Sequence, residues 1–134
     1  MAIRGFDHVA VPLDNVEAML RFYETLGFTI VPLGNGLAYG AHVGTQKINF
    51  HSPELWQRES FTLRGPSALP GCGDFCFAWD GDEASLLGLI ERAGVTVIEG
   101  PVGRDGGAGM GTSLYIRDPD GNLIEFIRYA GGTT

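Results

Sequence analysis

Basic residues are scarce in this chain of 134 residues. Nine Lys and Arg stand against sixteen Asp and Glu, so the net charge at pH 7 is −7. A chain of this charge repels a phosphate backbone, because proteins that bind nucleic acid carry clustered positive charge. We therefore expect a protein that has no nucleic-acid partner.

Cysteine and long apolar runs are also rare. The two cysteines, Cys72 and Cys76, lie too close in sequence to suggest a disulfide framework, which favours a reducing compartment. No apolar run approaches the ~20 residues that a membrane-spanning helix needs, and residues 1–5 contain no signal-peptide core. We expect a cytoplasmic protein that does not bind membranes.

The first half of the chain has the pattern of one helix and four strands. Residues 6–12 alternate as a strand, and residues 16–26 carry apolar side chains at helical spacing before Gly27, a typical helix-ending residue. Three further segments have strand composition and are separated by turn signals: residues 28–33, 37–43 and 46–51. The order of elements is β-α-β-β-β.

The second half repeats this order after a connection, residues 52–71, that is rich in Pro and Gly. A strand pattern over residues 74–79 precedes a helical pattern that ends at Gly94, and three strand patterns follow at residues 95–99, 113–117 and 123–127. Because neither half is large enough to bury a core alone, we predict an α+β protein with a single domain, residues 1–134. Its two βαβββ modules span residues 4–51 and 72–129 approximately.

Four polar residues interrupt the apolar strands at similar places in the two halves. His8 and Asp74 lie in the first strand of each half, and His51 and Glu125 lie in the last. Because burying a charged group is costly, such positions point to a metal ligand or a general base. Two imidazoles with one or two carboxylates suit Zn²⁺, Ni²⁺, Mn²⁺, Fe²⁺ or Co²⁺. His42 has no counterpart in the second half, and we interpret it as structural.

Each of these residues also has a structural interpretation. His8 fits a hydrogen-bonded strand histidine, and His51 fits an exposed strand end. Asp74 fits the start of a strand, and Glu125 fits the solvent side of a one-sided sheet. Asn49 lies on the same strand face as His51 and is an alternative to it. Without Asp74, the other three predicted ligands form a two-histidine, one-carboxylate set with open coordination positions.

Other residues of the second half are candidates for contact with a substrate. Tyr115 and Arg117 share one face of a strand, and Arg117 either holds an anionic substrate group or pairs with a nearby aspartate. Cys76 shares a face with Asp74, although strand cysteines are usually inert. The glycine-rich residues 103–111 fit either a mobile lid or a solvated hairpin tip.

Several motifs resemble those of the vicinal oxygen chelate superfamily, which includes glyoxalase I, bleomycin-resistance proteins and extradiol dioxygenases. They are DHVAV at residues 7–11, RFYETLGF at 21–28, QKINFH at 46–51 and YIRDPDGNLIE at 115–125. The resemblance implies two βαβββ modules that form a cupped, mostly antiparallel mixed sheet around a divalent metal, with the helices outside. It also implies a homodimer.

By position, His8 and Glu125 match the metal ligands of this superfamily. Asp74 stands where many members have a histidine, which argues against strict glyoxalase I activity, and His51 ends the strand on which glyoxalases place a glutamate. The implied protein is a metal-dependent lyase or isomerase of glyoxalase type. It would chelate neighbouring oxygens of a small substrate and stabilise an enolate or oxyanion, with Glu125 also acting as base. The alternatives are a ring-cleaving Fe²⁺ dioxygenase and a metal-free protein of the bleomycin-resistance type.

Overall fold

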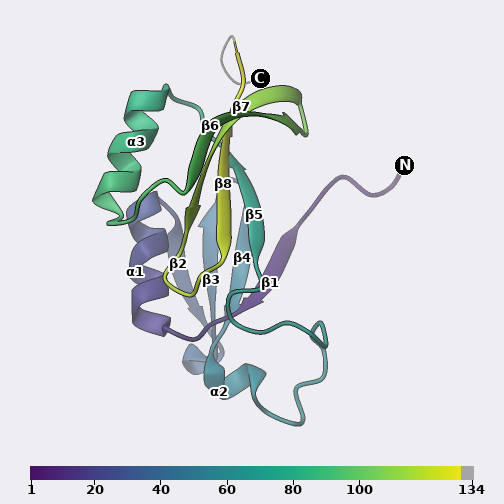
Figure 1. The fold of residues 1–134 in the computed structure, drawn as a ribbon. Helices are drawn as coiled ribbons and strands as arrows, with labels where there is room; N and C mark the ends of the chain where they lie inside the picture. Colours follow the sequence, from purple (N-terminus) through teal and green to yellow (C-terminus); the bar gives the residue numbers. More distant parts are fainter. Residues whose placement is uncertain (131–134) are drawn as a thin grey trace. The chain divides into compact units, whose positions relative to one another are not determined.

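The computed structural model describes residues 1–130, which form two compact units divided between Cys72 and Gly73. The first unit contains β1 (His8–Pro12), α1 (Val16–Leu26), β2 (Thr29–Leu33), β3 (Ala38–Val43), β4 (Gln46–His51) and the short helix α2 (Pro53–Trp56). The second unit contains β5 (Asp74–Ala78), α3 (Glu83–Arg92), β6 (Glu99–Gly106), β7 (Gly109–Arg117) and β8 (Leu123–Arg128). The predicted βαβββ order is confirmed in both units (Figure 1).

Each unit has its own four-stranded mixed sheet, and the two sheets have the same topology. The strand order is β1-β4-β3-β2 in the first unit and β5-β8-β7-β6 in the second. In both sheets the first strand pairs in parallel with the last, and the other neighbours are antiparallel. The α+β prediction is confirmed, with two four-stranded sheets that do not close on themselves.

The helix α1 covers one face of the first sheet (Figure 1). Phe22 and Tyr23 on this helix are buried, and the Tyr23 ring lies 5.2 Å from that of Phe28 and 5.0 Å from that of Phe50. The apolar residues of α1 recur three and four positions apart, so they form one stripe that packs on the sheet. The helix ends at Gly27, whose φ of 108° is a conformation that favours glycine.

In the second unit, α3 and one face of the sheet supply the core. Buried side chains come from the helix and from β7 and β8: Leu86, Leu89, Ile90, Leu114, Ile116, Ile124 and Phe126. The pairs Leu114–Phe126 and Ile116–Ile124 lie opposite each other in the β7–β8 ladder, so they share one sheet face. The residues between them therefore point to the opposite face.

One prediction for residues 95–111 is wrong, and one open alternative is resolved. We expected a strand that ended before Gly100 and Pro101, but β6 begins at Glu99 and continues through Pro101. The strand tolerates proline because it lies at the edge of its sheet, and its register shifts at a bulge between Glu99 and Val102. Of the two interpretations of residues 103–111, the hairpin is supported and the lid is not, because most of the segment is paired between β6 and β7.

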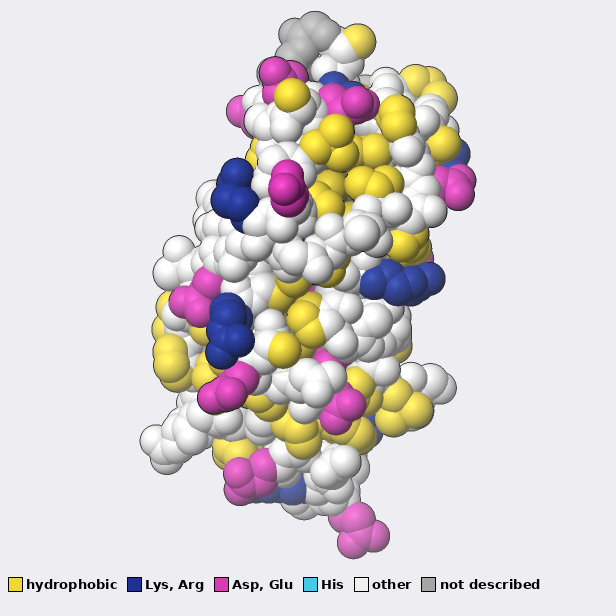
Figure 2. All heavy atoms as spheres, turned by 60° about the vertical axis from the view of Figure 1, so that its left-hand side comes forward, with side chains coloured by type: hydrophobic (Ala, Val, Ile, Leu, Met, Phe, Trp, Pro, Cys, Tyr) yellow, Lys and Arg dark blue, Asp and Glu magenta, His cyan; other side chains and the backbone are white. Residues whose placement is uncertain are grey.

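None of the helices in residues 1–130 is long and apolar enough to cross a membrane. Figure 2 shows one face of the molecule, on which the Lys and Arg side chains are scattered singly among acidic ones. No basic patch of the kind that binds a phosphate backbone is visible on this face.

Candidate functional site

The second sheet has a polar face on the side opposite its apolar core. Glu99, Tyr115, Glu125 and Cys76 are paired in turn across β6, β7, β8 and β5. Directly paired residues point to the same side of a sheet, so these four side chains form one row. The next row contains Arg117, Leu123 and Asp74. The structure thus brings Asp74, Tyr115, Arg117 and Glu125 to one face, as predicted.

Glu125 is half-buried and held by a neighbour in the sheet. The Ser113 hydroxyl donates a hydrogen bond of 2.6 Å to Oε2 of Glu125, and Ser113 itself is fully buried. This contact argues against the solvent-facing interpretation of Glu125. Partial burial and then the Glu125 carboxylate raise the pKa of the Cys76 thiol to about 11. Cys76 is therefore a neutral neighbour of Glu125 at physiological pH, and its inert interpretation is supported.

A buried turn fixes the position of Glu125 along its strand. Asp118 between β7 and β8 is buried, and its Oδ1 accepts hydrogen bonds from the backbone N–H groups of Asp120 and Asn122. Its Oδ2 accepts a bond of 2.8 Å from the Asn122 side chain. The Asn122 side-chain oxygen accepts a bond of 2.7 Å from the N–H of Gly73, just before β5. The turn therefore links the starts of β5 and β8, which carry Asp74 and Glu125.

In the first unit, the two predicted histidine ligands lie on the same face but at different levels of the sheet. His8 pairs with Lys47, and His51 lies four residues further along β4. Four residues of a parallel strand span about 13 Å. This spacing along the strand disfavours binding of one ion by His8 and His51 of the same unit.

The register instead makes Asn49 the equivalent of Glu125. His8 pairs with Lys47 and Asp74 pairs with Leu123, so Asn49 and Glu125 each lie two residues beyond the partner of the first-strand residue. The side-chain oxygen of Asn49 is buried and has no hydrogen-bond partner within residues 1–130. Asn49, which the sequence left as an alternative to His51, thus occupies the position diagonal to His8.

His8 is held by the residue that precedes it. Its Nδ1 lies 2.7 Å from Oδ2 of Asp7. Because a carboxylate accepts hydrogen bonds, this contact fits the tautomer that carries its proton on Nδ1 and leaves Nε2 as the ligating atom. Histidine ligands of metals are commonly oriented by a carboxylate in this way.

His51 contacts the connection that follows it. Its ring lies edge-on to the Phe61 ring at 5.2 Å, and burial together with the nearby Arg64 lowers its pKa below 6.5. Trp56 in the same connection donates a hydrogen bond to the carbonyl of Leu13 and stacks with Arg64. His51 therefore helps to attach the connection to the first sheet.

No three His, Cys, Asp or Glu side chains in residues 1–130 are grouped closely enough to hold a metal ion. The predicted ligand set takes His8 and His51 from the first unit and Asp74 and Glu125 from the second. It stays a prediction.

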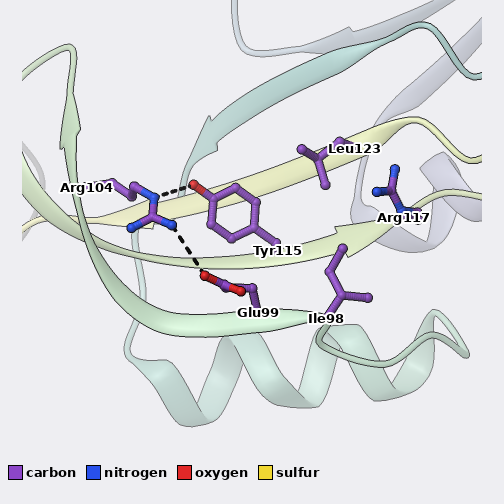
Figure 3. A pocket seen from close by; sticks show the side chains of 6 residues that line it. All are labelled: Ile98, Glu99, Arg104, Tyr115, Arg117 and Leu123. Carbon is purple, nitrogen blue, oxygen red and sulfur yellow. Dashed lines mark hydrogen bonds and ion pairs between the residues drawn. The ribbon is translucent and has the colours of Figure 1, made fainter.

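A pocket of about 360 Å³ opens on the polar face of the second sheet (Figure 3). Its walls include the two predicted substrate contacts from β7, together with residues of β6 and β8 and the residue before β6: Ile98, Glu99, Arg104, Tyr115, Arg117 and Leu123. Glu125 lies next to this lining, because it is paired with Tyr115. Figure 3 shows the Arg104 guanidinium between the Tyr115 hydroxyl and the Glu99 carboxylate, at distances of 2.9 and 3.5 Å. Arg117 donates to the carbonyl of Gly121.

Comparison with known proteins identifies the family. The model of the Glyoxalase/Bleomycin resistance protein/Dioxygenase superfamily matches residues 5–126. The chain belongs to this superfamily. The resemblance noted in the sequence is therefore confirmed over most of the chain.

Several known proteins are similar to this chain over nearly its whole length. The chain is 38% identical over 133 residues to virulence protein STM3117 of Salmonella typhimurium, covering 96% of this chain and 87% of the relative. The crystal structure of that protein matches with a TM-score of 0.85, 37% identity and coverage of 97% and 100%. The glyoxalase domain-containing protein RDO1 of Mycosarcoma maydis is 33% identical, with coverage of 96% and 70%. An integron cassette protein from the mobile metagenome of V. cholerae matches with a TM-score of 0.84, 37% identity and coverage of 97% and 98%.

Sequence reasoning missed four residues of the two polar faces. Asp7 and Ser113 had usable signals, because Asp7 adjoins His8 and Ser113 alternates with Tyr115. Arg104 and Glu99 had none, because the predicted strand ended before Gly100 and the following residues were interpreted as a loop.

Proposed function

We propose that this superfamily member is a divalent-metal-dependent enzyme of the glyoxalase type, a lyase or isomerase that acts on a small oxygenated molecule. The observation that carries the proposal is that two pairs of metal-donor side chains lie at equivalent register positions in the two sheets. His8 and Asn49 in the first sheet correspond to Asp74 and Glu125 in the second. We propose that these four side chains hold the ion.

The donor groups suit a divalent ion. With its proton on Nδ1, His8 presents Nε2 as a ligating atom, and the buried side-chain oxygen of Asn49 has no other partner in residues 1–130. With Asn49 in place of His51, the set has one imidazole and three oxygen donors. Oxygen donors suit Mn²⁺ better than they suit ions that prefer nitrogen or sulfur ligands. We therefore favour Mn²⁺ among the five metals that the sequence suggested.

In this proposal the side chains of the second sheet divide the chemical work. A bound divalent ion supplies Lewis-acid polarisation of two neighbouring substrate oxygens. Glu125 accepts the proton that the substrate loses, while Ser113 holds its Oε2 in a fixed position. Tyr115 and Arg117 orient the substrate from the pocket beside Glu125. The neutral Cys76 thiol does not compete as a nucleophile.

Two alternatives have less support. A ring-cleaving Fe²⁺ dioxygenase of the predicted type needs His8 and His51 at one ion, and their spacing in the first sheet opposes this. A metal-free binding protein is opposed by the presence of His8 and Glu125, although the amide at Asn49 is a weaker metal ligand than the glutamate of glyoxalases. The homodimer and the cytoplasmic location stay predictions.

Metal analysis of protein purified without chelator tests the proposal. We expect about one Mn²⁺ or related ion per site, and we expect His8→Ala and Glu125→Gln to lose it. His42→Ala is the matched control, because this exposed histidine lies in the same row as His8 but outside the proposed set. Metal content that is unchanged in both variants would refute the proposal of a metal-dependent enzyme.

A second pair of variants tests the register. Asn49→Ala is expected to weaken metal binding, whereas His51→Ala is expected to leave it unchanged. The opposite result would restore His51 as the ligand from β4. Asp7→Asn is expected to weaken binding by about 10–100-fold, the usual effect of removing the group that orients a histidine ligand.

A further inference from the structure

The pocket beside Glu125 contains a charged group that the proposed chemistry does not use. We propose that Arg104 binds a carboxylate of the substrate, and that Glu99 occupies Arg104 until the substrate arrives. The substrate is then a small monocarboxylic acid with further oxygen atoms for the metal ion. These are either a pair of neighbouring oxygens apart from the acid group or a hydroxyl next to it. The inference deepens the proposed function and rests on it for the reaction, although not for the binding.

The guanidinium of Arg104 is oriented by contacts that do not neutralise it. Its Nε donates to the Tyr115 hydroxyl at 2.9 Å, and one terminal nitrogen donates to the carbonyl of Gly103 at 2.9 Å. The group also lies over the Tyr115 ring, 5.5 Å from the ring centre. These neutral partners fix the plane of the fork and leave its charge available to an anion.

The single anionic partner of Arg104 in the pocket, Glu99, is held weakly. The Arg104–Glu99 contact is 3.5 Å long, and the two side chains are 42% and 58% exposed. Exposed ion pairs of this kind contribute little to stability, so an incoming carboxylate exchanges with Glu99 at little cost. Glu99 is the first residue of an edge strand, next to a bulge, and the preceding Ile98 donates its backbone N–H to the carbonyl of Tyr115.

Charge and size select the ligand. Among the lining residues, Arg104 and Arg117 carry two positive charges and Glu99 one negative charge, so the lining attracts a small anion such as a carboxylate. Ile98, Leu123 and the Tyr115 ring supply apolar walls for a short carbon skeleton. A volume of about 360 Å³ lies near the lower end of ligand pockets, which run from roughly 300 to 1,000 Å³.

The pocket also lies at a useful distance from the proposed base. Tyr115 is directly opposite Glu125 in the β7–β8 ladder, and Leu123 lies two residues before it on the same face. Side chains at such positions are about 5–8 Å apart. A carboxylate held at Arg104 therefore leaves the rest of a small acid beside the Glu125 carboxylate, where a proton transfer is possible.

Binding of mandelate and lactate to the full chain, stripped of metal with EDTA, tests the inference by calorimetry or by NMR titration. We expect mandelate to bind and its neutral methyl ester to bind at least tenfold more weakly. Arg104→Gln is expected to weaken mandelate binding by about 10–100-fold, the usual effect of losing a charge-assisted hydrogen bond. Glu99→Gln is expected to tighten it, because the internal competitor is removed.

Matched controls separate the pocket from a general charge effect. Arg92→Gln and Glu91→Gln, on the exposed end of α3, are expected to change nothing. Four results would each overturn the inference. They are equal binding of the acid and its ester, binding of neither acid, weaker binding in Glu99→Gln, and tighter binding of inorganic phosphate than of mandelate. Because the experiment contains no metal, carboxylate binding by a chain that fails the metal test would refute the proposed enzyme and retain the pocket.

Discussion

The two sheets have the same topology, and their first and last strands pair in equivalent register. The side chains on their polar faces, however, are held by different numbers of contacts. In the second sheet, Glu125 is fixed by the fully buried Ser113, and an oriented arginine lines the pocket beside it. In the first sheet, His8 is held only by its exposed neighbour Asp7, and the Asn49 oxygen has no partner within residues 1–130. The shared register supplies equivalent positions, whereas local side chains decide how firmly each position is held.

The hairpins that lead into the last strands differ in the same way. The β3–β4 hairpin of the first unit turns through Gly44 and the exposed Thr45. The β7–β8 hairpin of the second unit turns through Asp118, which is 5% exposed and accepts three hydrogen bonds. Buried polar contacts therefore hold the turn of the second unit, whereas the corresponding turn of the first unit consists of exposed residues.

The largest expected effect comes from removing this turn contact. Asp118→Ala leaves three donors of Asp120 and Asn122 without their acceptor, two of them on a fully buried residue, and we expect a loss of about 3 kcal/mol or more in the free energy of unfolding. Thr45→Ala in the other hairpin is expected to change it by less than about 0.5 kcal/mol. Urea denaturation followed by circular dichroism measures both. Equal losses would mean that the two turns do not differ as described.

A pH-dependent effect is expected in the first unit. The pKa of His51 is lowered by burial and by Arg64, so the unfolded chain takes up a proton near pH 6.5 before the folded chain does. Stability is therefore full above pH 6.5 and falls as the pH drops toward the lower folded pKa. His51→Gln is expected to flatten this fall, and Arg64→Gln to reduce it in part, in unfolding curves between pH 7 and 5. An unchanged slope in His51→Gln would contradict this account.

The smallest expected effect compares the starts of the two long helices. Asp82 caps α3, with its side chain accepting a bond of 2.8 Å from the N–H of Ser85, whereas Asn15 at the start of α1 makes no side-chain cap bond. We expect Asp82→Ala to lower the thermal midpoint slightly and Asn15→Ala to lower it less.

The same variant has a pH signature. The hydrogen bonds from Ser85 lower the pKa of Asp82 below 3.8, so the contribution of the cap is complete above that pH and disappears as the pH falls through the lower folded value. The difference between wild type and Asp82→Ala is expected to vanish in that range. A difference that grows on acidification would exclude the cap as its source.

Much of the fold followed from the sequence because its signals are local. Helical spacing and the glycines at positions 27 and 94 predicted both long helices, and alternation predicted six of the eight strands closely. Residues 95–99 failed because their β-branched composition imitates a strand, whereas the strand begins only at Glu99. Proline at position 101 normally ends a strand, and only the edge position of β6 permits it.

In the candidate site, too, the local features were predictable from the sequence and the long-range ones were not. The sequence by itself determined the residue types, the βαβββ repeat and the presence of His8, Asp74 and Glu125 in the first and last strands, since these depend on local pattern. Only the tertiary structure gave Asn49 a register position equivalent to that of Glu125, because strand register is a property of two chain segments that pair at a distance. It also joined Arg104, Glu99 and Tyr115 into one pocket, since residues of neighbouring strands meet only when the ladder forms.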